Sequence, residues 1–438
     1  METRPSRLLP VFLASALCWG CTITIGGSAS FDDDTPTASG GTSTGKAPPL
    51  PEPTVWRIEP PPLTPDQQQR KDEVDQFLAE EYRDYKIVEA TQGYSGDIIY
   101  WMDSYSIPGA YPDPPPPVWT QEDLTPPPGA ELARTELELY PELRGPNGTT
   151  PIHRPDYTNY VMGLTSAGSL QDYIENYQVQ GKPIGANRLY AGLVSELPNM
   201  GASAIVNQFE GDVEHGTFTL IEVTVACRGS NFPATLEQVG AVLSRDRRNF
   251  FDSKMRMHVE FITPTGKGWE TRHFIPQPGR PYGPGAVVLG STPGLATQRE
   301  HRFDIWQDSM GNWWLAHNGN TLGHYPAHLF KTLNKSACTA AWYGEIYDET
   351  PTDWTWTDLG SGEFESAGYG YAAYVRNPIF RDLVFTAWSP GEDLVTKSTW
   401  MKPYDANCYT RTPLELGSPP WDRFFYLGGP GGDAPGCD

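Results

Sequence analysis

The chain has 438 residues, which is enough for two domains and their tails. Its formal net charge of −22 argues against nucleic acid or an anionic membrane surface as a partner. Glycine (44) and proline (43) are abundant, and so are tryptophan (14) and tyrosine (22). Frequent turns between aromatic segments predict an all-β body rather than a helical one.

The first 21 residues predict a targeting segment. Arg4 and Arg7 precede the apolar run Leu8–Leu17, which is too short to span a bilayer. The small residue before Cys21 and the polar stretch after it resemble a bacterial lipoprotein signal with Cys21 as the lipidated residue. Lipidation at Cys18 and plain secretion remain open. We therefore expect an exported protein, either a lipoprotein of the bacterial outer membrane or cell surface or a secreted one, and membrane contact only through this lipid.

Four cysteines remain after the targeting segment. An even number in an exported chain predicts two disulfides, for which three pairings are possible. We favour the pairings Cys227–Cys338 and Cys408–Cys437, of which the second would hold the C-terminal tail.

The region before residue 149 predicts a linker and then a small α+β domain over 63–148. Residues 22–62 are rich in Ser, Thr, Gly and Pro, as linkers are. A helix should begin at Thr64, because Gln67 completes a capping box. A strand is expected over 96–103, and the Gly-Pro-Asn-Gly turn at 145–148 marks the domain boundary.

Residues 149–438 predict an antiparallel β-sandwich of the jelly-roll kind, because short apolar or alternating runs follow one another with no long helix between them. A short helix is expected at Ala327–Leu333. The predicted strands are Leu189–Ser195, Ala202–Phe209, Thr217–Val225, Leu236–Leu243, Arg256–Ile262, Ala286–Leu289, Arg302–Gln307, Trp313–His317, Ala341–Tyr347, Tyr371–Phe385 and Phe424–Leu427.

Two glutamates stand out as candidates for chemistry. Strand alternation places Glu345 on one face with Tyr343 and Tyr347, and places Glu237 on a face with apolar residues. Partial burial beside these apolar residues would raise the pKa of Glu237, although spacing alone does not show that the two glutamates meet. No HExxH motif, phosphate-binding loop or Cys/His cluster is present, so we expect no metal and no cofactor. His324 and His328 are interpreted as structural.

Eight segments follow one another in the order of a known family: 201–207, 218–220, 235–242, 304–330, 342–345, 360–377, 407–409 and 425–437. Together they resemble the neprosin family of secreted glutamic endopeptidases that cut at proline. The resemblance implies that Glu237 and Glu345 are the two catalytic glutamates and that residues 63–148 are a propeptide that covers the groove and is cut away. The chain departs from the family around Glu237, where it has Glu-Gln-Val-Gly instead of Glu-Ala-Gly-Trp.

The resemblance implies a mechanism, and other functions remain open. Two close carboxylates cannot both ionise easily, so one would activate a water while the other donates a proton, with highest activity at acid pH. We expect peptide or protein substrates, proline-rich ones included, and predict no oligomeric state. A carbohydrate- or protein-binding module and a two-glutamate glycoside hydrolase remain alternatives. The expected substrate-binding walls are Tyr343, Tyr347, Trp313 and Trp314.

Overall fold

The computed structural model describes most of the chain between residues 46 and 437. Outside the described residues lie 1–45, 112, 116–124, 166, 175–187, 229–234, 265, 270–272, 349–356, 385–386, 389–406, 434–436 and 438. The predicted targeting segment with Cys21, and most of the predicted linker, fall in the first of these stretches. Among the described residues, no helix is long and apolar enough to cross a membrane.

A small N-terminal body packs helices against a three-stranded sheet. Helix α1 (Pro65–Glu81) begins at Thr64 with the predicted capping box, because Thr64 and Gln67 each bond to the other's backbone N–H. The antiparallel sheet has the order β1 (Ile87–Gln92), β2 (Ile98–Asp103) and β4 (Thr149–His153), and the helices α3 (Thr158–Met162) and α4 (Leu170–Tyr173) follow it. The buried core contains Val74, Leu78, Tyr82, Ala90, Tyr100, Met102, Ile107, Ile152, Tyr157, Tyr160, Tyr173 and Ile174.

This body extends past the predicted boundary at residue 148. Strand β4 begins directly after that point and pairs with β2, and Ile174 is still part of the same core. The last part of the predicted linker also contacts the body, because the N–H of Ala47 donates to the side chain of Glu80 at 3.0 Å. Residues 47–438 form one compact unit, and the division at residue 148 stays a prediction.

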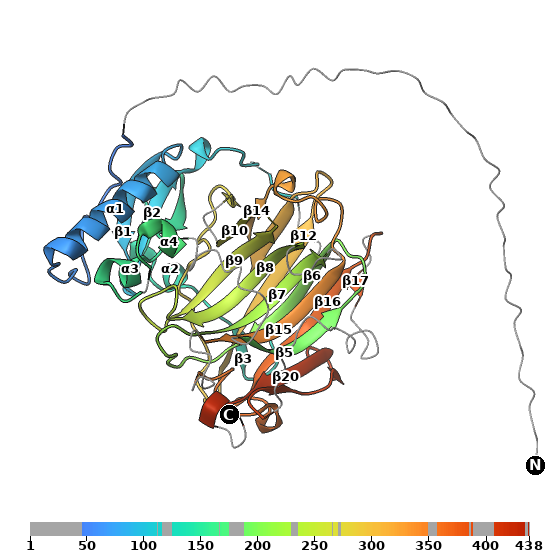
Figure 1. Cartoon of the computed structure of the whole chain (residues 1–438). Helices are drawn as coiled ribbons and strands as arrows, with labels where there is room; N and C mark the ends of the chain where they lie inside the picture. Colours follow the sequence, from blue (N-terminus) through green and yellow to red (C-terminus); the bar gives the residue numbers. More distant parts are fainter. Residues whose placement is uncertain are drawn as a thin grey trace, which may run out of the picture. The chain divides into compact units, whose positions relative to one another are not determined.

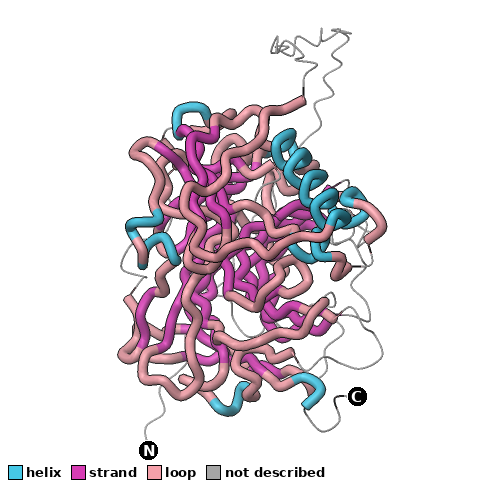
Figure 2. The backbone as a smooth tube through the Cα atoms, turned by 90° about the vertical axis from the view of Figure 1, so that its left-hand side faces the viewer, coloured by secondary structure: helices cyan, strands magenta, loops and turns pink. Residues whose placement is uncertain are grey.

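Two antiparallel sheets make up the rest of the described chain, which confirms the predicted β-sandwich (Figure 1). The first has the order β10 (Gly266–Trp269), β9 (Met255–Thr263), β8 (Leu236–Asp246), β7 (Phe218–Arg228), β15 (Thr339–Tyr347) and β5 (Arg188–Ser195). In Figure 2 the strands fill the middle of the body, and the helical segments lie at its periphery.

The second sheet has eleven strands. Its order is β11 (Ile275–Pro276), β14 (Asn320–Tyr325), β13 (Trp313–His317), β12 (Gln298–Gln307), β6 (Gly201–Asn207), β16 (Ala373–Arg381), β20 (Arg423–Gly428) and β18 (Thr410–Arg411). Strands β17 (Ala387–Trp388) and β19 (Glu415–Leu416) pair with β16 and β20. Strand β3 (Ala130–Leu132) adds to β12 in parallel, and helix α2 (Glu136–Leu139) follows it.

Most of the predicted strands are confirmed. Ten of the eleven coincide with strands of the sandwich, whereas Ala286–Leu289 forms only isolated bridges. The predicted helix at Ala327–Leu333 is a single 3-10 turn over Ala327–Leu329. Both predicted disulfides, Cys227–Cys338 and Cys408–Cys437, are present.

The central strands are buried on both faces, which explains their nearly continuous apolar sequences. Every residue of β15, and every residue of β7 except Arg228, is buried. We call the face of the six-stranded sheet that packs on the second sheet the inner face; it carries Val223, Val225, Val239, Ala241, Leu243, Trp342 and Ile346. The opposite, outer face carries Tyr190, Val194, Phe218, Leu220, Val242, Ala341, Tyr343 and Tyr347.

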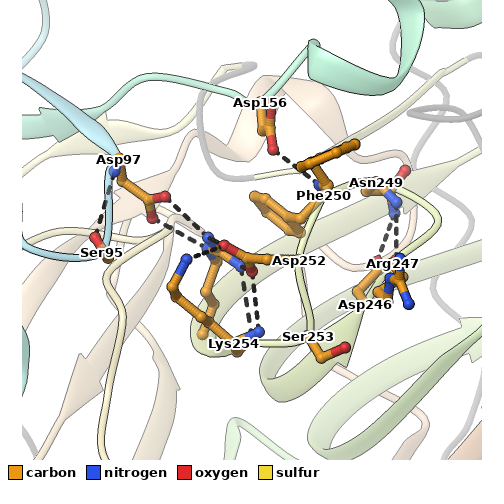
Figure 3. Close-up of polar contacts among 12 residues, drawn as sticks. Ser95, Asp97, Asp156, Asp246, Arg247, Asn249, Phe250, Asp252, Ser253 and Lys254 are labelled. Atoms are coloured by element: carbon orange, nitrogen blue, oxygen red, sulfur yellow. Dashed lines mark hydrogen bonds and ion pairs between the residues drawn. The ribbon is translucent and has the colours of Figure 1, made fainter. Parts of the chain in front are cut away.

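The N-terminal body is joined to the sandwich by ion pairs and hydrogen bonds at the loop after β8 (Figure 3). Arg256, at 1% side-chain exposure, pairs with Asp97 of the N-terminal body and with Asp252 of the sandwich. The N–H of Phe251 donates to the carboxylate of Asp156 at 2.9 Å. Figure 3 labels the three carboxylates Asp97, Asp156 and Asp252. Arg256 belongs to the outer face, in the register row of Ser244 and Leu220, so this contact lies on the same face as Glu345.

Candidate active site

Glu345 is a buried carboxylate on the outer face of the six-stranded sheet. Its cross-strand neighbours are Leu220 on β7 and Tyr190 on β5. Only 5% of its side chain is exposed, and its carboxylate forms an ion pair with the guanidinium of Arg188. Because an unpaired charge is costly to bury, this pair is what allows an ionised Glu345 at that depth.

A second group of carboxylates lies on the same face. The side-chain amide of Gln238 donates to Glu222 Oε1 at 2.9 Å and to Glu260 Oε1 at 2.7 Å. The hydroxyl of Tyr343 donates to the other oxygen of Glu222. Tyr343 pairs directly with Glu222 and stands two residues before Glu345 on β15, so Glu222 and Glu345 are diagonal neighbours. We call Glu222, Gln238, Glu260, Tyr343 and Glu345 the acidic network.

Gly240 makes room for this network. It lies between Glu260 on β9 and Thr224 on β7 in the register of the sheet. A Cβ atom at this position would lie 2.3 Å from Glu222 Oε1 and 3.0 Å from Glu260 Cγ. Any larger residue would push the two carboxylates away from the amide that joins them.

The surroundings of Glu222 and Glu345 affect their pKa values differently. Burial raises the pKa of Glu222 well above its usual value, the charges of Glu260 and Glu345 raise it further, and the hydroxyl of Tyr343 opposes them. Burial also raises the pKa of Glu345, but the Arg188 guanidinium acts in the opposite direction. Glu222 is therefore the carboxyl that favours the protonated form, whereas Glu345 has a cation beside it.

Residues 217–430 match the family model described as Neprosin. The chain therefore contains a neprosin domain. The matched residues include the whole acidic network. The neprosin domain identifies the chain as a peptidase, in agreement with the glutamic type predicted from the sequence.

Three solved structures also resemble the chain, but only weakly. A member of the eqolisin family of peptidases, SCP-B in complex with the tripeptide Ala-Ile-His, has 8% identity and a TM-score of 0.28. Scytalido-glutamic peptidase with a peptide-based transition-state analog has 9% identity and a TM-score of 0.27, and in both cases 55% of this chain and 97% of the other are covered. The β-porphyranase BpGH16B of Bacteroides plebeius has 7% identity, a TM-score of 0.17 and coverage of 36% and 54%. Similarities this low do not support any conclusion about the site or the activity of this chain.

Glu237 lies on the other side of the neprosin domain's first sheet. It pairs with Cys227 on the inner face, and its side chain is buried. Its carboxylate accepts hydrogen bonds from the backbone N–H groups of Lys331 (2.9 Å), Thr332 (2.8 Å) and Leu333 (2.8 Å). The structure therefore does not bring Glu237 and Glu345 together, because residues 237 and 238 point to opposite faces and it is Gln238 that joins the acidic network.

The four predicted substrate-binding aromatics divide between two places. Tyr343 and Tyr347 lie on the outer face with Glu345, as the strand alternation indicated. Trp313 and Trp314 belong to the second sheet and are fully buried. The indole of Trp313 donates to the carbonyl of Leu333 in the core between the sheets, and Trp314 stacks on His324 on the far side of that sheet. The structure therefore places Trp313 and Trp314 on a different sheet from Glu345, and their substrate-binding role stays a prediction.

Sequence reasoning missed Glu222, Gln238, Glu260 and Arg188. The run Thr-Leu-Ile-Glu-Val-Thr-Val around Glu222 carried a usable signal, because a lone acid inside a buried strand needs a specific reason. Gln238 and Glu260 carried no such signal, since only the register of β8 with β7 and β9 brings them together. Among the described residues, no group of three or more His, Cys, Asp or Glu side chains could hold a metal ion.

Proposed function

We propose that the chain is an exported glutamic endopeptidase whose reacting groups are Glu345 and Glu222. The observation that carries the proposal is the pair of buried carboxyl groups on neighbouring strands of one face, one beside an arginine and the other bonded to Tyr343 and Gln238. Environments that push two carboxyl groups toward different protonation states suit general acid and base roles.

The proposed reaction is direct hydrolysis of a peptide bond. The carboxylate of Glu345 takes a proton from a water, and the resulting hydroxide attacks the peptide carbonyl carbon. The protonated Glu222 donates a hydrogen bond to the carbonyl oxygen as negative charge develops there. Glu345 then passes its proton to the leaving nitrogen, the C–N bond breaks, and both carboxyl groups return to their starting states.

The cleavage preference, the pH optimum and the zymogen form are proposed mainly from the sequence. We propose cleavage next to proline, because the resemblance to the neprosin family implies it. We propose highest activity at acid pH, because both carboxyl groups ionise as the pH rises and the acid is then lost. We also propose a zymogen in which the N-terminal body is the inhibitory part. The ion pair of Arg256 with Asp97 and the hydrogen bond from the Phe251 N–H to Asp156 support this, since they attach that body to the sandwich.

The test uses the purified protein without residues 1–21, incubated at about pH 3 and at pH 7 with a mixture of proline-containing peptides. Mass spectrometry follows the protein and the peptides, in parallel for Glu345→Gln, Glu222→Gln and the control Glu196→Gln. Glu196 is an exposed carboxylate at the end of the same sheet. Peptide cleavage that both network variants lose and the control retains supports the proposal. Intact peptides at both pH values, with the wild-type protein folded, would favour a binding module. Turnover of a polysaccharide alone would favour a glycoside hydrolase.

A further inference from the structure

Arg188 is held more firmly than an ordinary ion-pair partner. It is the first residue of β5 and lies outside the neprosin match, at a side-chain exposure of 14%. Its guanidinium pairs with Glu345 and lies over the rings of Phe218 and Tyr347, at 5.5 Å and 5.2 Å from their centroids. The planar guanidinium is thus fixed both by a carboxylate and by two aromatic faces.

The two rings form a rigid support for this arginine. Phe218 and Tyr347 are cross-strand partners and stack with centroids 5.3 Å apart and an angle of 17° between their planes. A second guanidinium, that of Arg248, lies 4.6 Å from the centroid of Tyr347. The aromatic pair therefore has little freedom to turn, and the direction from which Arg188 approaches Glu345 is set by the sheet itself.

Burial and the charge of Glu260 disfavour the negative charge of Glu345, and Arg188 opposes them. Its site is buried, and two further carboxylates lie on the strands beyond it. Arg188 is the cation in direct contact with it. The titratable and charged groups on this face around Glu345 are Arg188 and Tyr190 of β5, Glu222 of β7, Asp246 of β8, Arg256, His258 and Glu260 of β9, Tyr343 and Tyr347 of β15 and Arg248 of the loop after β8.

We propose that Arg188 is a positioning residue that keeps Glu345 ionised inside this acidic network and fixes the direction of its carboxylate. This inference rests on the proposed function, because it assumes that Glu345 is the base. Without Arg188, burial and the neighbouring carboxylates would raise the pKa of Glu345 further, toward that of Glu222. The enzyme would then have two acids and no base in the same pH range.

The experiment compares the dependence of kcat/KM on pH for the wild-type enzyme, Arg188→Met, Arg188→Lys and the control Arg228→Met. Arg228 ends the neighbouring strand β7 and forms an exposed ion pair with Glu196 at 2.9 Å. The acid limb of the profile reports the ionisation of the base. Since a close opposite charge lowers a carboxyl pKa by roughly one to three units, Arg188→Met should move this limb upward by about one to two pH units.

At a pH one unit below the wild-type limb, Arg188→Met should therefore lose roughly tenfold or more in kcat/KM beyond its loss at higher pH. The limb of Arg188→Lys should move less, because an ammonium keeps the charge but not the planar contact with the rings. KM should change little, and Arg228→Met should keep the wild-type profile. A folded Arg188→Met enzyme with an unmoved acid limb would overturn the proposal, as would a uniform loss of activity at every pH.

A stability measurement separates this proposal from the proposed function and from simple misfolding. Urea unfolding of Arg188→Met, Glu345→Gln and the double variant forms a double-mutant cycle. If the two side chains act as a charged pair, the second substitution should recover part of the stability that the first one loses. Additive losses would contradict the pairing. Full activity of Glu345→Gln would overturn the proposed function instead, and the cycle would still decide whether Arg188 and Glu345 are coupled.

Discussion

The two faces of the six-stranded sheet bury glutamates in opposite ways. On the inner face, Glu237 accepts hydrogen bonds from three backbone N–H groups and meets no other carboxylate among its hydrogen-bond partners. On the outer face, Glu222 shares the amide of Gln238 with Glu260 and lies diagonal to Glu345. A carboxylate that accepts hydrogen bonds from backbone N–H groups holds the loop that carries them. Carboxylates close to one another raise each other's pKa, and a raised pKa is what a general acid needs.

The largest expected loss of activity comes from a substitution on the outer face. Glu345→Gln removes the base and keeps the shape of the side chain, so kcat/KM should fall by roughly 10²- to 10⁴-fold. Thermal unfolding should show a folded protein, because the amide oxygen can still accept from Arg188. The measurement is peptide hydrolysis at acid pH, beside the control Glu196→Gln. Retention of more than a tenth of wild-type activity would exclude Glu345 as the base.

The matching change on the inner face should affect the fold instead of the chemistry. Glu237→Gln turns one acceptor into an N–H₂ group that faces the backbone N–H groups of residues 331–333, so at least one buried donor loses its partner. We expect a loss of about 1–3 kcal/mol in the free energy of unfolding. Urea unfolding measures this, and kcat per folded molecule should stay within a few-fold of wild type. A stable but inactive Glu237→Gln protein would return Glu237 to the catalytic role predicted from the sequence.

The sequence predicted the fold well. Of the two carboxyl groups in the proposed site, it predicted Glu345 but not Glu222. Aromatic and apolar runs between turns gave the strands, and the even cysteine count together with the tail position gave both disulfides. Strand alternation placed Tyr343, Glu345 and Tyr347 on one face without knowledge of the partners. Glu222 carried a signal as a lone acid inside an apolar strand, but its neighbours could not be found in this way. Only the register of β8 with β7 and β9 brings Gln238 and Glu260 to Glu222 and turns Glu237 to the other face.

The proton preference of Glu222 gives a pH-dependent prediction. Its pKa is raised in the folded protein, so the protonated form stabilises the fold below the usual glutamate pKa, and this stability is lost as pH rises through the raised value. Glu222→Gln is neutral at every pH. It should match the wild type in urea unfolding at about pH 3 and be more stable than the wild type at pH 7, by about 1.4 kcal/mol for each unit of raised pKa. Equal stabilities at both pH values would mean that Glu222 ionises normally.

The smallest change in activity should come from the predicted substrate-binding aromatics. The sequence analysis placed them in one site, and the structure places them on two sheets. Tyr343→Phe removes the hydroxyl that donates to Glu222, so kcat should fall while the ring still packs on Tyr190. Trp314→Phe removes an indole N–H that donates to Asp308 at 2.8 Å in the second sheet. It should cost about 1–3 kcal/mol of stability and leave KM for a proline-containing peptide unchanged. Steady-state kinetics on both variants, at a temperature where both are folded, decide the point. A raised KM in Trp314→Phe alone would mean that substrate reaches the far sheet, whereas a loss of kcat confined to Tyr343→Phe places the chemistry on the face that holds Glu345.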